Sequence, residues 1–324
     1  MMTPYVRYRL DVIRETSMAM SSTALSSGKQ WAPQLTGRLP MEVLRTIAMS
    51  TSVAACRSIQ DSDALLSAGF TSLILTRPIV DPEALCKLGT IASKVKITAT
   101  VDHFRHAELL SQNLCPGTTV DILIDVDLGQ QVTGVRPGPD STLLATAAAR
   151  LPGIRIRGVL VNDRAGDNEW RSAANGSIKR LSHDESLAVA QHCRRMIEND
   201  GNECRETVTG ATRDASKLAF DVVTTCLSSP LTAHGRPAIE LVCRVLSRPS
   251  LEWGVINVGT ALLGDLRHTR ILEPAGARFL HGCEDIATLS LAGEALDLRI
   301  GAEVVVSSHY LSNQQHLPVV VLDN

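Results

Sequence analysis

Polar side chains that could transfer protons follow two neighbouring apolar runs of the chain. Asp102 and His103 come directly after Lys96–Val101, and Asp127 closes the next apolar run. A histidine beside a carboxylate can act as a general base, because the carboxylate orients the ring and stabilises its charged form. One interpretation therefore makes His103 a base with Asp102 or Asp127 beside it. The other is that Asp102 and His103 simply begin a helix, with Asp102 as its N-cap.

A second pair of carboxylates lies on the following run. Asp125 and Asp127 are two residues apart, which places both on one face of an extended strand. Inside a barrel such a pair needs a cation or hydrogen-bond donors, whereas outside it the pair would contact helix residues. The sequence leaves both arrangements open.

The elements that must position these groups alternate in type from about residue 30 to residue 226. Short apolar segments, hydrophobic nearly throughout, alternate with amphipathic stretches, as expected of parallel strands covered by helices. Eight such units predict an α/β fold, a (β/α)8 TIM-like barrel, although an open doubly wound sheet would alternate similarly. The predicted strands are Trp31–Leu35, Thr51–Cys56, Ser72–Arg77, Lys96–Asp102, Asp121–Asp127, Ile154–Asn162, Glu203–Thr209 and Asp221–Cys226.

Two helices have recognisable first turns. Asp81 precedes Pro82, a residue that the first turn of a helix tolerates because its missing N–H has no partner there. Ser182 and Glu185 have the spacing of a capping box ahead of a helix through Met196.

The pattern changes after Leu231, where strand-like segments follow one another with little helical periodicity. We expect residues 1–230 to form the barrel and residues 231–324 a small antiparallel β domain, which the first ten or so residues could join. The predicted strands are Arg236–Ser247, Leu251–Val258, Arg278–His281, Leu296–Ile300, Glu303–Ser307 and Leu317–Leu322.

The composition excludes several function classes. The 32 Lys and Arg against 34 Asp and Glu, with few aromatic residues, do not suit nucleic-acid binding. No apolar run approaches the ~18 residues of a membrane span, and no apolar signal core follows Met1–Leu10, so we expect a cytoplasmic protein. The eight cysteines lack zinc-site spacing.

Several motifs share one order with a known family. Ile124–Gly129 followed by Thr133–Gly138 resembles the central signature of the D-threonine aldolase and D-serine dehydratase family, fold-type III pyridoxal-phosphate (PLP) enzymes related to alanine racemase. Thr3-Pro4, Ala68–Phe70 and Arg236–Pro249 resemble its flanking segments. The resemblance covers nearly the whole chain and implies the barrel, the β domain and a head-to-tail homodimer.

The family's cofactor-binding lysine has no counterpart in this resemblance. It lies in an Arg-Pro-His-x-Lys-Thr-His-Lys stretch at the end of the first barrel strand, and alignment on Thr36 and Pro40 places Leu35 at its position. A leucine has no amine to form a Schiff base with PLP. Lys29 is six residues upstream, too far along a strand to replace it.

Other positions of the family pattern differ as well. The ring arginine corresponds to Val132, and the aspartate of an Asp-Ala-Gly stretch to Asn257. A tyrosine and a histidine after the sixth strand correspond to Asn162 and Ala165. The His-x-Cys metal pair falls on Tyr310 and Ser312, with His309 one residue away. From these departures we expect neither PLP nor zinc.

The family's phosphate loop is partly retained. Thr209-Gly210-Ala211-Thr212 occupies its place, where small residues let backbone N–H groups converge on an anion. An ordinary turn between a strand and a helix would use the same residues, and both interpretations stay open.

Together these residues predict a pocket for a small molecule at the carboxyl ends of the barrel strands. We expect a PLP-independent enzyme that catalyses a cyclisation, isomerisation or lyase-type step. The alternatives are a non-catalytic pseudoenzyme or metabolite-binding partner of an active homologue, and a conventional PLP-dependent lyase or racemase. The expected catalytic residues are His103, Asp127, Asn162 and Tyr310, and the expected substrate-pocket residues are Leu35, Val132, Asp163, Arg164, Asn257 and Ser312.

Overall fold

The computed structural model describes residues 3–129, 132–161, 182–212, 220–225, 232–233, 236–308 and 317–323. The chain divides into two compact units, one formed by Met18–Cys226 and the other by Met1–Ser17 together with Leu227–Asn324.

The larger unit contains an eight-stranded parallel sheet that closes on itself. Its strand order is β2-β9-β8-β7-β6-β5-β4-β3, and the ring closes where Ala55 N donates to Pro33 O at 2.9 Å and Leu35 N donates to Ala55 O at 2.8 Å. The predicted (β/α)8 barrel is confirmed. The strands are β2 (Gln30–Trp31), β3 (Val53–Cys56), β4 (Ser72–Leu75), β5 (Lys96–Val101), β6 (Val120–Val126), β7 (Ile154–Val161), β8 (Glu206–Thr212) and β9 (Val222–Thr225).

Side chains from alternate positions of these strands fill the barrel. Because successive side chains of a strand point to opposite faces, the residues that meet in the interior identify which face is inward. One buried cluster draws on seven of the strands or their extensions and comprises Ala32, Val53, Ala55, Ile74, Leu123, Leu160, Val208 and Val222. Residues two positions further along each strand are therefore the next inward layer toward the carboxyl ends.

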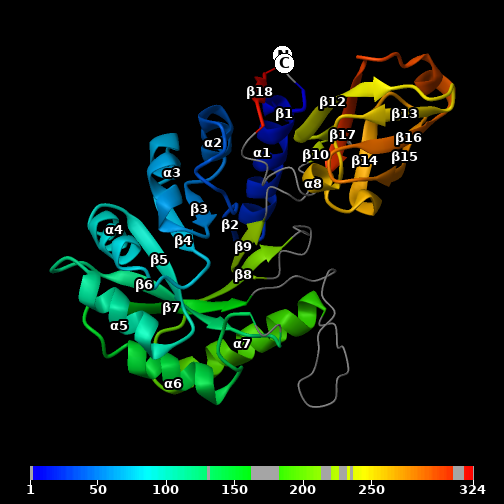
Figure 1. The fold of residues 1–324 in the computed structure, drawn as a ribbon. Coiled ribbons are helices and arrows are strands. Elements are labelled where there is room, and N and C mark those ends of the chain that lie inside the picture. Colours follow the sequence, from blue (N-terminus) through cyan, green and yellow to red (C-terminus); the bar gives the residue numbers. More distant parts are fainter. Residues whose placement is uncertain are drawn as a thin grey trace. The chain divides into compact units, whose positions relative to one another are not determined.

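The helices of this unit lie along the outer side of the strands (Figure 1). Asp81 caps one of them by accepting from Ala84 N, and Ser182 with Glu185 forms the predicted capping box of another. They are α1 (Leu10–Ser26), which crosses into this unit, α2 (Met41–Ala48), α3 (Ser62–Ala68), α4 (Pro82–Ala92), α5 (Phe104–Asn113), α6 (Pro139–Ala148) and α7 (His183–Asn199), with a short 3-10 helix at Ile59–Asp61. None of the described helices is long and apolar enough to cross a membrane.

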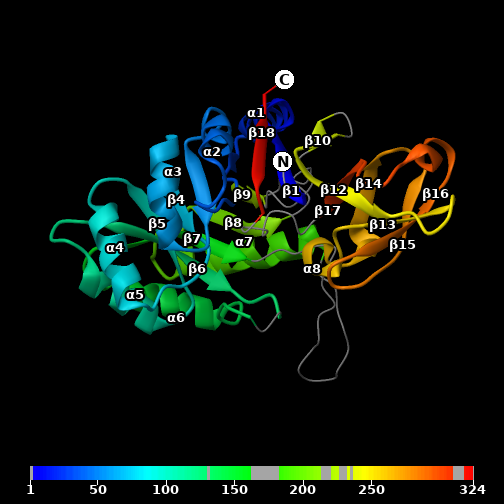
Figure 2. The ribbon, with the colours of Figure 1, turned by 45° about the horizontal axis from the view of Figure 1, so that its top comes forward.

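The smaller unit is built around a second sheet, which is antiparallel except for the pairing of β1 with β18. Its main path runs β14-β17-β12-β13-β16-β15, while β1 pairs with β12 and β18; Figure 2 shows β13, β15 and β16 side by side. The strands are β1 (Tyr5–Arg9), β12 (Ile239–Ser247), β13 (Trp253–Ile256), β14 (Thr269–Glu273), β15 (Ala277–Gly282), β16 (Ala287–Leu291), β17 (Glu303–Ser308) and β18 (Val319–Leu322). Shorter elements are β10 (Thr232–Ala233), β11 (Arg236–Pro237), α8 (Thr260–Leu263) and 3-10 helices at Leu266–His268 and Gly293–Asp297.

One strand predicted for this unit is wrong. Leu296–Ile300 begins within the 3-10 helix Gly293–Asp297 and pairs with no strand, and two real strands, β14 and β16, were missed. Arg248 explains the difference, because its guanidinium donates to the carbonyl oxygens of Leu296 and Leu298, which a ladder would otherwise use. The apolar side chains of Leu296 and Ile300 are exposed.

Candidate functional site

Strands β5 and β6 place Asp102 and Asp125 side by side at the barrel mouth, the carboxyl-terminal end of the barrel strands. Strands β5 and β6 are neighbours whose last paired residues are Val101 and Ile124. Asp102 and Asp125 come one residue later on each strand. Since Asp125 is two residues beyond the interior Leu123, its side chain faces the barrel interior. Asp125 has no exposed surface.

Asp102 is held by two groups. His106 Nδ1 on the first turn of α5 lies 2.8 Å from Asp102 Oδ1, and Gly134 N donates to Asp102 Oδ2 at 3.0 Å. A carboxylate on one ring nitrogen fixes the orientation of an imidazole. The pair is half-buried at the carboxyl end of β5.

The two carboxyl groups have pKa values that diverge. The contact with His106 and the N–H of Gly134 outweigh partial burial and lower the pKa of Asp102. Burial raises the pKa of Asp125 to about 7; a hydrogen bond from Thr133 opposes this, and the charges of Asp102 and Asp127 add to it. Neighbouring titratable groups with pKa values pushed apart are the usual arrangement of an acid and a base. This arrangement can therefore hold one proton on Asp125 beside an ionised Asp102 near neutral pH.

The segment after β6 folds back over the end of its own strand. Asp127 N donates to Val135 O at 2.8 Å, and Val135 N donates to Asp125 O at 2.9 Å. Gly134 has φ +110°, and a Cβ there would lie 2.4 Å from Asp127 N. Only glycine fits this close approach, which brings the N–H of Gly134 to Asp102.

The structure assigns local roles to the two predicted catalytic residues that it describes. His103, and not Asp102, is the N-cap of α5: its Nδ1 accepts from Arg105 N at 3.0 Å, and its ring is exposed. The prediction of Asp102 as the N-cap is wrong, because that carboxylate is engaged by His106. Asp127 Oδ1 accepts from Gly129 N at 2.9 Å in the turn after β6.

The described pocket candidates are dispersed. Leu35 is 4% exposed and Val132 is 68% exposed. Asn257 belongs to the smaller unit, where it accepts from Arg244 N at 2.7 Å and donates to Thr3 Oγ1 at 3.2 Å. The other pocket candidates Asp163, Arg164 and Ser312, the catalytic candidates Asn162 and Tyr310, and Ala165 and His309 lie outside the described residues.

The former phosphate loop is part of a strand. β8 continues through Thr212, which pairs with Thr225 of β9, so Thr209, Gly210, Ala211 and Thr212 have strand rather than turn backbone. Thr209 is 2% exposed. The segment after Thr212 lies outside the described residues.

Sequence reasoning missed His106 and Thr133. The signal for His106 was present, because Asp102 and His106 are four residues apart and a helix begins between them. Thr133 contacts Asp125 only because the chain reverses after β6, and no local pattern indicates that contact. Among the described residues, no group of three His, Cys, Asp or Glu side chains is placed to bind a metal.

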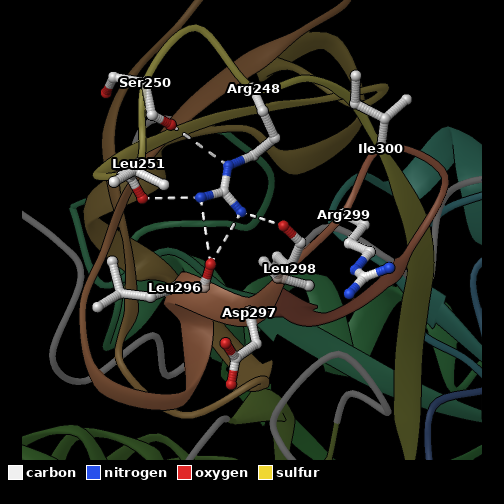
Figure 3. Close-up of a pocket in the computed structure, with 8 residues that line it drawn as sticks. All are labelled: Arg248, Ser250, Leu251, Leu296, Asp297, Leu298, Arg299 and Ile300. Atoms are coloured by element: carbon white, nitrogen blue, oxygen red, sulfur yellow. Dashed lines mark hydrogen bonds between the residues drawn. The ribbon is translucent and has the colours of Figure 1, made fainter.

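A cavity in the smaller unit is a poor candidate site. It lies beside Arg248, whose guanidinium nitrogens donate to carbonyl oxygens of Ser250 at 3.4 Å, of Leu251 at 2.7 Å, and of Leu296 and Leu298 (Figure 3). These bonds engage every nitrogen of the guanidinium and join two loops. The cavity is therefore the space beside a structural clamp rather than a ligand site.

No family model matches the chain. A curated D-threonine aldolase of Arthrobacter sp. is 25% identical over 182 residues, 53% of this chain and 45% of that enzyme, so the match spans under half of the relative's length. The crystal structure of D-threonine aldolase from Filomicrobium marinum superposes with a TM-score of 0.79 at 18% identity, over 97% of this chain and 89% of that one. The chain has the alanine-racemase-like fold. D-threo-3-hydroxyaspartate dehydratase from Delftia sp. HT23 has a TM-score of 0.76 at 15% identity, over 99% and 95% of the two chains.

These neighbours contradict the prediction that no cofactor is used. The proteins that the chain resembles in sequence and structure, which include alanine racemase, belong to the fold-type III PLP enzymes. A metal-free form of the dehydratase is among the similar structures, which marks that enzyme as one that binds metal. The expectation of neither PLP nor zinc is therefore corrected: the chain has the fold of cofactor-dependent enzymes.

The described residues nevertheless do not fit covalent attachment of PLP. Leu35, which the sequence resemblance assigns to the family lysine, is buried and apolar. Lys29 lies at the opposite end of the barrel, with Nζ 3.4 Å from Asp221 Oδ1. Lys87, on the outer helix α4, contacts Asp63. Lys179 and Lys217 lie outside the described residues.

Proposed function

We propose that this protein is a lyase that eliminates water from small 3-hydroxy acids at the barrel mouth, with Asp125 as proton donor and His106 as proton acceptor. The observation that carries the proposal is the pair of neighbouring strand ends that bring Asp102, with His106 on it, next to the fully buried Asp125. Catalytic groups of this fold class lie at these strand ends.

The proposed step uses the two groups in opposite directions. His106 takes the proton from the carbon next to the substrate carboxylate, and the C–H electron pair becomes the new carbon–carbon double bond. The neighbouring C–O bond breaks, and Asp125 donates its proton to the departing oxygen, which leaves as water. Exchange with solvent then returns His106 to its neutral form and Asp125 to its protonated form.

The supporting residues set the direction of transfer. Asp102 orients His106 and stabilises the charge that the ring gains. Burial keeps the proton on Asp125, whose pKa is about 7, until the leaving oxygen needs it. Gly134 N, donating to Asp102, keeps that carboxylate ionised.

The substrate class is taken from the similar proteins. One is named for D-threonine and another for D-threo-3-hydroxyaspartate. Both compounds are small 2-amino-3-hydroxy acids. Their shared hydroxyl, two carbons from the carboxylate, is the group that the proposed step removes.

A second candidate is a PLP-dependent lyase or racemase acting on amino acids. The comparisons support it, because the neighbours are PLP enzymes. It requires a lysine elsewhere than at the position of Leu35 to form the Schiff base with PLP.

One experiment separates the candidates. The purified protein is incubated with D-threonine and D-threo-3-hydroxyaspartate, with and without added PLP, and 2-oxo acids, ammonia, glycine and acetaldehyde are measured. The proposal expects 2-oxo acid and ammonia, the hydrolysis products of the dehydrated amino acids, with a loss of activity in Asp125→Asn. Borohydride reduction that leaves one phosphopyridoxyl adduct on a single lysine supports the second candidate. Turnover of neither compound by the wild type contradicts both and supports a non-catalytic role.

We also propose that the protein forms a homodimer and that its other partner is its small-molecule substrate. Large apolar side chains of the smaller unit are strongly exposed, including Leu251 at 78%, Trp253 at 52% and Ile300 at 68%. Such exposure is common at subunit interfaces. Sedimentation velocity tests this: a dimer supports the proposal, and a monomer at micromolar concentration contradicts it.

A further inference from the structure

The barrel wall opposite Asp125 presents an amide side chain. Gln34 lies just beyond β2 and forms a parallel bridge with Ala55, which belongs to the interior cluster. Bridged partners share a face, and Gln34 is also two residues beyond the interior Ala32. Its side chain therefore faces the barrel interior.

Gln34 and Asp125 occupy the same layer of the barrel. Ala32 and Leu123 are both in the interior cluster, and Gln34 and Asp125 are each two residues further toward the carboxyl ends. In the closed ring of eight strands, β2 and β6 are four strands apart in either direction. The two side chains thus lie on opposite walls at the barrel mouth.

The side-chain oxygen of Gln34 is buried and accepts no hydrogen bond within the described structure. A buried acceptor without a donor lowers stability, and native proteins rarely keep one without a use. Leu35, the next residue, is apolar and points to the opposite face of the strand, so its side chain offers no donor. A ligand that brings its own donor to this point satisfies the oxygen.

We propose that Gln34 is a substrate-binding residue whose amide oxygen accepts a hydrogen bond from the substrate amine, which makes the site specific for 2-amino-3-hydroxy acids over 3-hydroxy acids that lack the amine. The inference rests on the proposed function and adds its specificity. With the amine on Gln34 and the hydroxyl toward Asp125, the substrate bridges the two walls. The carbon that bears the amine is the carbon that loses its proton.

The test compares the wild type with Gln34→Leu, which has a similar volume and no acceptor, and with Gln34→Glu, which keeps an acceptor. The probes are D-threonine and its des-amino analogue, 3-hydroxybutanoate. Calorimetric affinity and kcat/KM are measured for both probes, together with the ligand-free Tm. Wild-type affinity for D-threonine should exceed that for 3-hydroxybutanoate.

In Gln34→Leu, D-threonine should lose roughly 10- to 100-fold in affinity and in kcat/KM, whereas 3-hydroxybutanoate should change less than about threefold. The ligand-free Tm should stay equal or rise, because an unpartnered buried acceptor has been removed. Gln34→Glu should retain most of the affinity for D-threonine. A residue with only a structural role would instead lower the Tm and leave the ratio of the two probes unchanged.

The outcomes distinguish this inference from the proposed function. If Gln34→Leu leaves the preference for D-threonine intact while Asp125→Asn abolishes turnover, the role of Gln34 is overturned and the proposed function stands. If Asp125→Asn keeps full turnover, the proposed function fails, whatever Gln34 does. If the wild type binds neither probe, the inferred substrate class is overturned.

Discussion

The two ends of the barrel treat their carboxylates differently. At the amino-terminal ends of the strands, Asp121 of β6 accepts from Arg155 Nε at 2.6 Å and lies 4.0 Å from Lys96 Nζ. Asp221, just before β9, contacts Lys29 and Arg194 at 3.4 Å each. Each of these carboxylates is matched by cations that keep their charge at all ordinary pH values.

At the carboxyl-terminal ends, the partner of Asp102 is a histidine, whose charge changes with pH. Asp125 is fully buried and lies near two other carboxylates, Asp102 and Asp127, on the same mouth. Both ends bury acidic groups, but among the described residues those at this end contact a histidine and other carboxylates instead of lysine and arginine. The difference indicates that charge pairing at one end holds the barrel together, while the other end keeps protons available for transfer.

The largest expected effect concerns the histidine of the mouth. His106→Asn should lower kcat on the 3-hydroxy acid substrate by roughly 10²- to 10⁴-fold, because general base catalysis is lost. His103→Asn is the matched control: asparagine is also a good N-cap, so kcat should change less than about threefold. Steady-state kinetics of both variants are the measurement. Equal losses of kcat in the two would contradict the role of His106 as the general base.

The next effect is the pH dependence that Asp125 gives to stability. Its pKa is about 7 in the folded protein, against the ordinary aspartate value of 3.8, so folding favours the protonated form. The stability that this contributes is complete below about pH 4 and is lost as the pH rises toward 7, on the order of 4 kcal/mol. Asp125→Asn removes this dependence.

Urea unfolding of the wild type and of Asp125→Asn at pH 4 and pH 8 measures it. The free energy of unfolding of the variant should gain about 4 kcal/mol relative to the wild type between the two pH values. A difference that stays constant with pH would mean that Asp125 is an ordinary carboxylate, like those at the other end.

A smaller effect is expected for the glycine that closes the loop over Asp102. Gly134→Ala should lower the free energy of unfolding by about 3 kcal/mol, because φ is +110° and the new Cβ meets the backbone of Asp127. Gly117→Ala is the control: φ is +79° but nothing lies within 4 Å, so only the backbone strain of about 1 kcal/mol remains. Chemical denaturation compares the two, and equal losses would contradict the crowding at Gly134.

The smallest effect is expected at the amino-terminal ends of the strands, where carboxylates pair with lysine and arginine. Glu206→Gln removes the partner of the buried Arg157, whose Nε lies 2.8 Å from Glu206 Oε2, and should cost about 2 kcal/mol of stability. Because this pair is structural, kcat should stay within about twofold. A large loss of kcat with little loss of stability would reverse the roles assigned to the two ends.

The barrel was predictable from sequence because its strands are apolar on both faces, a pattern that parallel strands share. The capping box at Ser182 and Glu185 was equally local and was correct. In the smaller unit the pattern failed at Leu296–Ile300, because an arginine distant in sequence, Arg248, engages the carbonyls of that segment.

The site was only partly predictable. Asp102 and Asp125 stood out as polar residues at the ends of apolar runs. His103 was named as the candidate base and His106 was missed, because adjacency in sequence is easier to see than one helical turn. Gln34 was hidden for a different reason. Its orientation follows from barrel closure at Ala55, a contact between strands that no local pattern contains.

The most direct test is a ¹³C NMR titration of the side-chain carboxyls in protein labelled at aspartate, with Asp125→Asn and Asp102→Asn used for assignment. We expect the Asp125 carboxyl to titrate near pH 7 and the Asp102 carboxyl below the usual range for aspartate. If both titrate together near pH 4, the barrel mouth holds no proton donor beside an ionised carboxylate, and the proposed acid–base site is contradicted.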